Sequence, residues 1–204
     1  MVLKVLAIGD LSNNIVMFKK FTKSNIHLIN FPWDGPSKVI DIRDGVEFFK
    51  SVKVKDVLKR INEIKNEFDI CIAMSSTGLL MSYLADLNYI AYFCGHDIRS
   101  PPFIKDMHDP LSTDKPIYDF NSLERRYYKK AYDNAIAAVV TDDELLEHLK
   151  KYRDDPTRIT GYIVDTTIFN ENVKPVERKK TKFTFISPAR MGLQKGTEKI
   201  WEAL

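Results

Sequence analysis

Short hydrophobic runs alternate with amphipathic segments along the chain, and this alternation is typical of an α/β protein. The runs are apolar at nearly every position, which predicts strands buried on both faces by helices, as in a parallel sheet. We therefore expect a Rossmann-like parallel sheet with helices on both faces. The strands are expected at residues 3–8, 26–31, 69–74, 89–94 and 135–140, with shorter ones at 39–42 and 158–164.

The clearest helical pattern spans residues 53–68, where hydrophobic residues recur at intervals of three and four. Lysine and arginine occupy much of the remaining surface from Lys50 to Lys65, so this helix is basic as well as amphipathic. Two interpretations stay open. The basic face is either the ordinary solvated face of a packed helix, or it makes peripheral contact with an anionic membrane through residues 50–65.

The composition changes after residue 169, which suggests a domain boundary. Residues 170–182 carry many charges, a proline and almost no core material, so we expect a linker after a domain of residues 1–169. The pattern of residues 183–204 predicts a strand, a loop and a helix. A lone βα unit cannot bury its own faces, so we expect that it either adds to the first sheet or begins a second domain whose remainder is absent.

Overall composition narrows the class of protein. The chain has 204 residues, 44% of them hydrophobic, and a formal net charge of +3, which is too mild to argue for nucleic acid. No hydrophobic run approaches the length needed to span a bilayer, and no signal-peptide pattern is visible, so a cytoplasmic protein is expected. Cys71 and Cys94 lie inside apolar runs without metal-ligand spacing, and we expect buried thiols with no metal site.

Candidate chemistry gathers where the predicted strands end, because ligands of open α/β sheets bind beyond the carboxyl ends of the strands. Gly9 ends the first strand and offers close approach of the backbone to a ligand. Ser75 and Ser76 follow the 69–74 strand, where they either bind a polar ligand or, with Thr77, cap the next helix. The strand expected at 89–94 is followed by Gly95, His96, Asp97 and Arg99. Of these, Asp97 is the first catalytic candidate and His96 the second.

Two further segments have both a structural and a functional interpretation. Thr141 and Glu144 form a capping-box pattern, while Asp142 and Asp143 could alternatively act as paired catalytic carboxylates. In the expected helix 121–134, basic residues alternate with tyrosines; this pattern suits either a substrate-gripping surface or amphipathic packing.

Three segments together resemble the retaining glycosyltransferases of the GT-B class, in particular the large family-4 group. Residues 93–98 resemble the family's His-Gly-x-Asp-Ile segment, with Cys94 standing where the family has its histidine. Residues 158–169 are similar to the segment that closes the amino-terminal domain. Residues 185–196 look like the start of the carboxy-terminal domain, with its Arg…Lys-Gly pattern.

The resemblance implies an amino-terminal, acceptor-side domain followed by the first βα unit of the donor domain. Transfer would run from a nucleotide-sugar donor to a hydroxyl of a sugar or lipid-linked acceptor, with retention and with no metal or other cofactor. Arg190 and Lys195 would contact the donor diphosphate, because a guanidinium and an ammonium can stabilise the leaving phosphate. This chain alone is expected to be inactive. The alternatives are a nucleotide-sugar epimerase of the same architecture, or a non-catalytic α/β binding module.

Overall fold

The computed structural model describes residues 2–10, 14–32, 45–94, 122–158, 163–167 and 170–172, with the side chains of 122–125 and 158 excepted. The chain divides into two compact units, one of residues 1–103 and 120–165 and the other of residues 104–119 and 166–204. The fold described below is that of the first unit.

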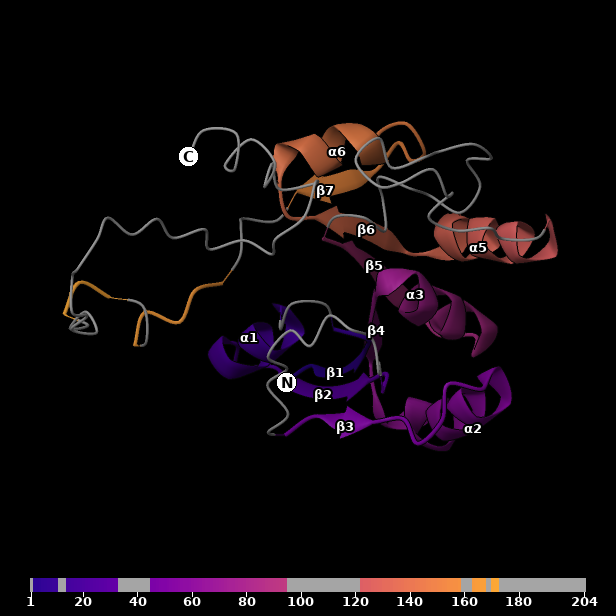
Figure 1. Ribbon diagram of the computed structural model, residues 1–204, viewed down its shortest axis with the longest axis horizontal. Coiled ribbons are helices and arrows are strands. Elements are labelled where there is room, and N and C mark those ends of the chain that lie inside the picture. The colour runs from indigo at the N-terminus through magenta and orange to yellow at the C-terminus, as the bar shows by residue number, and fades with distance from the viewer. Residues whose placement is uncertain are drawn as a thin grey trace, which may run out of the picture. The chain divides into compact units, whose positions relative to one another are not determined.

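A parallel sheet forms this unit, and its strands run in the order β3-β2-β1-β4-β5-β6-β7 (Figure 1). Every neighbouring pair is parallel. The prediction of a Rossmann-like parallel sheet is therefore confirmed. The strands are β1 (Lys4–Ile8), β2 (Asn25–Asn30), β3 (Glu47–Phe48), β4 (Ile70–Met74), β5 (Tyr89–Phe93), β6 (Ala137–Val140) and β7 (Pro156–Arg158).

Helices cover both faces of the sheet, as expected for parallel strands. Side chains of β1 alternate between two hydrophobic clusters: Leu6 and Ile8 pack with α2, α3, α5 and α6, whereas Val5 and Ala7 pack with α1. Figure 1 shows α1 on the side of the sheet opposite α2, α3 and α5. The helices are α1 (Asn14–Phe21), α2 (Val54–Ile64), α3 (Ser75–Leu84), α5 (Ser122–Asn134) and α6 (Asp143–Leu149), and a 3₁₀ turn, η1 (Lys65–Glu67), extends α2.

Helix starts differ from the prediction in two places. Strand β4 passes into α3 at Ser75 with no connecting loop, and the Ser75 hydroxyl, not that of Ser76 or Thr77, accepts a hydrogen bond from the N–H of Gly78 at 3.3 Å. Helix α6 is capped by Asp142, whose Oδ1 accepts from the N–H of Leu145 at 2.9 Å. The predicted capping box at residue 141 is wrong by one position.

Strand boundaries also differ at the sheet edges. Strand β3 was not predicted, because two residues show no periodicity. The last strand covers only 156–158 of the described residues, and 163–164 are not in a strand; Pro156 can begin it because a proline is tolerated at the first residue of an edge strand. The predicted strand at 39–42, most of the linker at 170–182 and the βα unit at 183–204 lie outside the described residues, so the predicted domain boundaries stay predictions.

An ion pair joins Asp165, in the segment that follows β7, to α1. The carboxylate of Asp165, only 3% exposed, accepts a hydrogen bond from the ammonium of Lys20 in α1.

Among the helices that the structure describes, none is both long and apolar enough to cross a membrane.

Candidate functional site

The strand order reverses between β1 and β4, and this switch point is where a ligand-binding crevice is expected. The chain builds β2 and β3 on one side of β1, then crosses to build β4 to β7 on the other. In open α/β sheets, ligands bind beyond the carboxyl ends of the strands at such a switch point. Here β1 ends at Ile8 and β4 at Met74, so Gly9 and Ser75 begin the two segments that leave the sheet there.

Two glycines let these segments approach each other closely. Gly9 has a φ of +83°, and a Cβ on it would lie 2.5 Å from the carbonyl oxygen of Met74. A Cβ on Gly78, in the first turn of α3, would lie 2.4 Å from the carbonyl oxygen of Ile8. Both distances are impossible for real carbon atoms, so these positions require glycine. The backbone ends of β1 and α3 are therefore in direct contact beside the crevice.

Ser75 stands at the turn from β4 into α3 with a φ of +69°, which is uncommon for a residue other than glycine. Its hydroxyl is bound to the first turn of its own helix, and Ser75, Ser76 and Thr77 are all half-buried. The first turn of α3 has no acidic residue, and its N-cap residue, Met74, makes no side-chain capping hydrogen bond. The amino end of this helix therefore combines hydroxyl groups with the positive end of the helix dipole.

The exit of β1 is built differently, because a carboxylate fills the amino end of α1. The two carboxylate oxygens of Asp10 accept hydrogen bonds from the N–H groups of Ile15 at 3.1 Å and Val16 at 3.0 Å. Asp10 is 7% exposed. Helix amino ends often bind phosphate through these same N–H groups. The protein's own carboxylate occupies the N–H groups of Ile15 and Val16, so these two groups are not available to a phosphate.

Asn30 fixes the position of Asp10. The Oδ1 atom of Asn30 accepts hydrogen bonds from the N–H of Asp10 at 3.1 Å and from its neighbour Phe31 at 2.9 Å, and its Nδ2 donates to the Asp10 carbonyl oxygen at 3.3 Å. Asn30 is also 7% exposed. The ends of β1 and β2 are thus joined by a buried polar clamp next to the crevice.

Three of the predicted site residues, Gly9, Ser75 and Ser76, are described, and they lie at the two neighbouring strand ends. The clamp residues Asp10 and Asn30 were missed. The sequence signal for them was weak, a polar residue directly after or at the end of an apolar run. The remaining predicted residues lie outside the described part of the chain: Gly95, His96, Asp97, Arg99, Arg190 and Lys195.

Neither Cys94 nor Cys71 is in a disulfide. Cys94 follows β5 and is half-buried, whereas Cys71 is 2% exposed in β4, and burial raises the pKa of its thiol to about 12. Its Sγ lies 3.5 Å from the hydroxyl of Ser82, which opposes the rise in pKa. Cys71 is therefore a core residue and not a nucleophile. Among the described residues, no group of three or more histidine, cysteine or acidic side chains could hold a metal ion.

Two of the tyrosines of α5 serve in packing and do not form a substrate-gripping surface. Tyr128 and Tyr132 are buried, and Tyr132 stacks on Phe93 with 5.1 Å between ring centroids. Tyr127 is exposed, with the ammonium of Lys130 6.0 Å from its ring centroid.

At the start of α6, the capping role of Asp142 accounts for this residue without a catalytic function.

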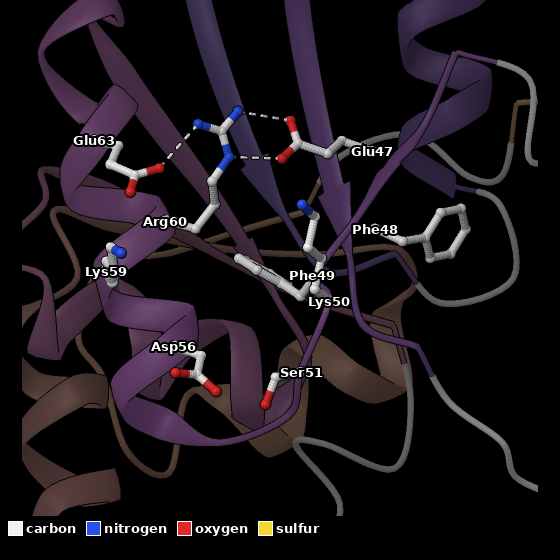
Figure 2. A pocket seen from close by; sticks show the side chains of 9 residues that line it. All are labelled: Glu47, Phe48, Phe49, Lys50, Ser51, Asp56, Lys59, Arg60 and Glu63. Carbon is white, nitrogen blue, oxygen red and sulfur yellow. Dashed lines mark hydrogen bonds and ion pairs between the residues drawn. The ribbon is translucent and has the colours of Figure 1, made fainter.

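A separate cavity of about 540 Å³ lies between β3 and α2 (Figure 2). At one end Glu47 binds the Arg60 guanidinium through two hydrogen bonds of 2.7 and 3.1 Å, and His27 lies 2.9 Å from the same carboxylate. The hydrogen bond from Arg60 lowers the pKa of the Glu47 carboxyl, with a smaller contribution from His27. The cavity is lined by Glu47, Phe48, Phe49, Lys50, Ser51, Asp56, Lys59, Arg60 and Glu63.

Comparison with known proteins identifies no family. No family model matches the sequence, and no curated protein matches it. Among solved structures, the chain is similar to the UDP-N-acetylglucosamine 2-epimerase of Rickettsia bellii, at 13% identity and a TM-score of 0.44, over 74% of this chain and 42% of that one. It is also similar to Phytolacca americana UGT2, solved with UDP-2-fluoro-glucose and pterostilbene, at 12% identity and a TM-score of 0.45, over 81% of this chain and 55% of that one. The chain thus spans about half the length of these structures.

Proposed function

We propose that this chain forms the acceptor-side part of a retaining GT-B glycosyltransferase of the family-4 type. The parent reaction is transfer of a sugar from a nucleotide-sugar to a hydroxyl of a sugar or lipid-linked acceptor. Support comes from the three sequence segments that resemble this family. A Rossmann-like sheet with a crevice at its switch point is compatible with the same function.

The observation that carries the acceptor-side assignment is the Asp10 carboxylate at the amino end of α1. A domain that held the donor diphosphate at this turn would need those N–H groups for phosphate. Here two of them are used internally, and Gly9, just before Asp10, donates its own N–H to the Ile29 carbonyl oxygen. The neighbouring exit of β4 offers the hydroxyl groups of Ser75 and Ser76. Hydroxyl groups of this kind can form hydrogen bonds with a hydroxyl-bearing acceptor.

The roles of the remaining residues follow from the resemblance. Gly95, Asp97 and Arg99 would continue the acceptor wall from the exit of β5, with Asp97 contacting the reacting sugar and His96 assisting it. Arg190 and Lys195 would bind the donor diphosphate, where a guanidinium and an ammonium stabilise the charge that develops on the leaving phosphate without a metal. A cytoplasmic location agrees with the cytoplasmic supply of nucleotide-sugars that this reaction needs.

A nucleoside diphosphate release assay tests this function. The polypeptide encoded by the whole reading frame is incubated with UDP-, GDP- and ADP-linked sugars and a set of glycoside and lipid acceptors. Acceptor-dependent release is expected from one donor, and we expect Arg190→Ala or Lys195→Ala to reduce it about a hundredfold or more. Lys151→Ala, exposed just after α6, is the matched control and should leave the rate unchanged.

Other outcomes would identify the alternatives. Conversion of a nucleotide-sugar into its epimer, with no acceptor-dependent diphosphate release, would contradict the transferase and support the epimerase. A folded protein that binds no nucleotide-sugar and releases no diphosphate from any donor would support a non-catalytic module.

A further inference from the structure

The segment that leads into α2 exposes two hydrophobic residues among lysines. Val52 is 60% exposed and Val54 is 47% exposed. Lys50, Lys53 and Lys55 alternate with them and are also exposed. Lys59, one turn further along the helix, is exposed as well, and we call these six residues the valine–lysine cap.

The apolar face of α2 itself is not available to a partner. Val57 and Ile61 are 1% and 0% exposed, because they pack against the sheet. Arg60 binds Glu47 and Glu63, so its charge is already compensated. The membrane contact expected for residues 50–65 is therefore restricted to the amino-terminal end of this region.

Charge is distributed unevenly along the same region. The cap has four exposed lysines and one exposed carboxylate, that of Asp56. The far end of the helix and η1 expose two carboxylates, those of Glu63 and Glu67. An anionic surface would therefore attract the cap end more strongly than the other end, which sets an orientation.

We propose that the valine–lysine cap docks the domain on the surface of an anionic lipid bilayer. Val52 and Val54 would enter the boundary between headgroups and acyl chains, and the lysine ammonium groups would lie near the lipid phosphates. Two valines bury little apolar surface, so the contact is shallow, reversible and dependent on anionic lipid. This proposal does not depend on sugar transfer and is tested without it.

A soluble phosphate compound is a weaker match than a bilayer. The adjoining cavity is lined by Lys50, Lys59 and Arg60, but also by three carboxylates (Figure 2), so its lining has no excess positive charge. Lys53, Lys55 and the two exposed valines do not line this cavity. An extended anionic surface uses both features at once.

Vesicle co-sedimentation of the full chain tests the proposal. The vesicles contain phosphatidylcholine alone, or phosphatidylcholine with about 30% phosphatidylglycerol. Binding is expected on the anionic vesicles only, and it should be lost at about 0.5 M salt. Lys53→Gln/Lys55→Gln should lower the partition coefficient by more than about tenfold, since each lysine near an anionic surface contributes about fivefold.

A second variant separates the apolar contribution from charge. Val52→Ser/Val54→Ser retains every charge and should weaken binding by about fivefold. Both pairs are exposed, so native folding is expected and is checked by thermal melting. The control is Lys150→Gln/Lys151→Gln at the end of α6, which removes two exposed lysines elsewhere and should leave binding unchanged.

Several results would overturn the proposal. These are equal binding to neutral vesicles, equal loss in the α6 control, or full binding by either the lysine or the valine variant. Competition by millimolar glycerol phosphate would also overturn it, because it would indicate a site for a soluble phosphate compound. If the lysine variant does not fold, the valine variant alone decides.

Discussion

Asn30 and Asp10 bind each other reciprocally across the ends of two neighbouring strands. The Asp10 N–H donates to the Asn30 side chain at 3.1 Å, and that side chain donates back to the Asp10 carbonyl oxygen at 3.3 Å. The same Asp10 then caps α1 through its carboxylate. One buried side chain therefore positions both the end of β1 and the start of the first helix.

Replacing Asn30 tests this clamp. Asn30→Ala leaves two N–H groups in this buried region without their acceptor, and we expect a loss of about 2 kcal/mol in the free energy of unfolding. Asn134→Ala removes a hydrogen bond from an exposed asparagine to the Lys130 carbonyl and should cost less than about 0.5 kcal/mol. Urea denaturation measures both. Equal effects of the two variants would mean that the Asn30 contacts are unimportant.

Replacing Gly78 by alanine has two opposite effects on the free energy of unfolding, one from helix propensity and one from the contact with β1. An alanine normally stabilises a helix by about 1 kcal/mol relative to glycine. At position 78 the new methyl group would lie 2.4 Å from the Ile8 carbonyl oxygen, so we expect Gly78→Ala to destabilise by about 2 kcal/mol or more.

Gly45→Ala is the control for this experiment. At position 45 a Cβ would meet only the Lys19 ammonium, at 3.5 Å, and the φ of +71° alone should cost about 1 kcal/mol. A stabilising Gly78→Ala would show that β1 and α3 are not in the close contact described above.

The buried thiol of Cys71 predicts a dependence of stability on alkaline pH. Its pKa is raised by burial from 9.0 to about 12, so the unfolded chain loses this proton at a lower pH than the folded one. Stability is therefore fully present below pH 9 and falls as the pH rises from 9 toward 12, at up to about 1.4 kcal/mol per pH unit.

The contribution of Cys71 is isolated by comparing variants. Burial also raises the pKa of Tyr89 and of Tyr152, which adds a decline in the same direction. Urea midpoints at pH 8 to 10.5 should decline less steeply in Cys71→Ala than in the unaltered protein, whereas Cys94→Ala should retain the full slope. Identical slopes in all three proteins would contradict a buried thiol at position 71.

The hydrogen bond between Arg60 and Glu47 predicts an effect at acidic pH. The Glu47 pKa is lowered from 4.5, so this contribution is present above pH 4.5 and is lost as the pH falls through the folded-state pKa. The pair is partly exposed and screened by solvent, and Glu47→Gln should cost less than about 1 kcal/mol at pH 7.

This cost should disappear toward pH 3, as measured by thermal unfolding at several pH values. Glu63→Gln removes only a 3.4 Å contact to Arg60 and should have a smaller effect at every pH. A constant difference between Glu47→Gln and the unaltered protein from pH 7 to 3 would exclude an ionic origin.

Buried parallel strands were predictable because they are continuous apolar runs. The runs that became β1, β4 and β5 needed no knowledge of their neighbours, since a strand covered on both faces must be apolar throughout. Strand β3 was missed because it has only two residues. Its Glu47 is held in place by hydrogen bonds to Arg60, which lies in the next helix. A tertiary contact of that kind leaves no local pattern.

The site was less predictable than the sheet. Gly9 and Ser75 were singled out because glycine and serine end apolar runs. The clamp by Asn30 depends on which strands are neighbours, and that information is not local. The cap of α6 shifted from Thr141 to Asp142 because both residues can cap a helix, and the backbone geometry selects between them.

The acceptor-side assignment is tested most directly by separating the two Michaelis constants of the transfer reaction. Ser75→Gly tolerates the positive φ while removing the hydroxyl, and Ser76→Ala removes its neighbour's. Each lost hydrogen bond should raise the KM for the acceptor by about fivefold to tenfold. The account predicts this rise with an unchanged KM for the nucleotide-sugar; a rise in the donor KM with an unchanged acceptor KM would contradict it.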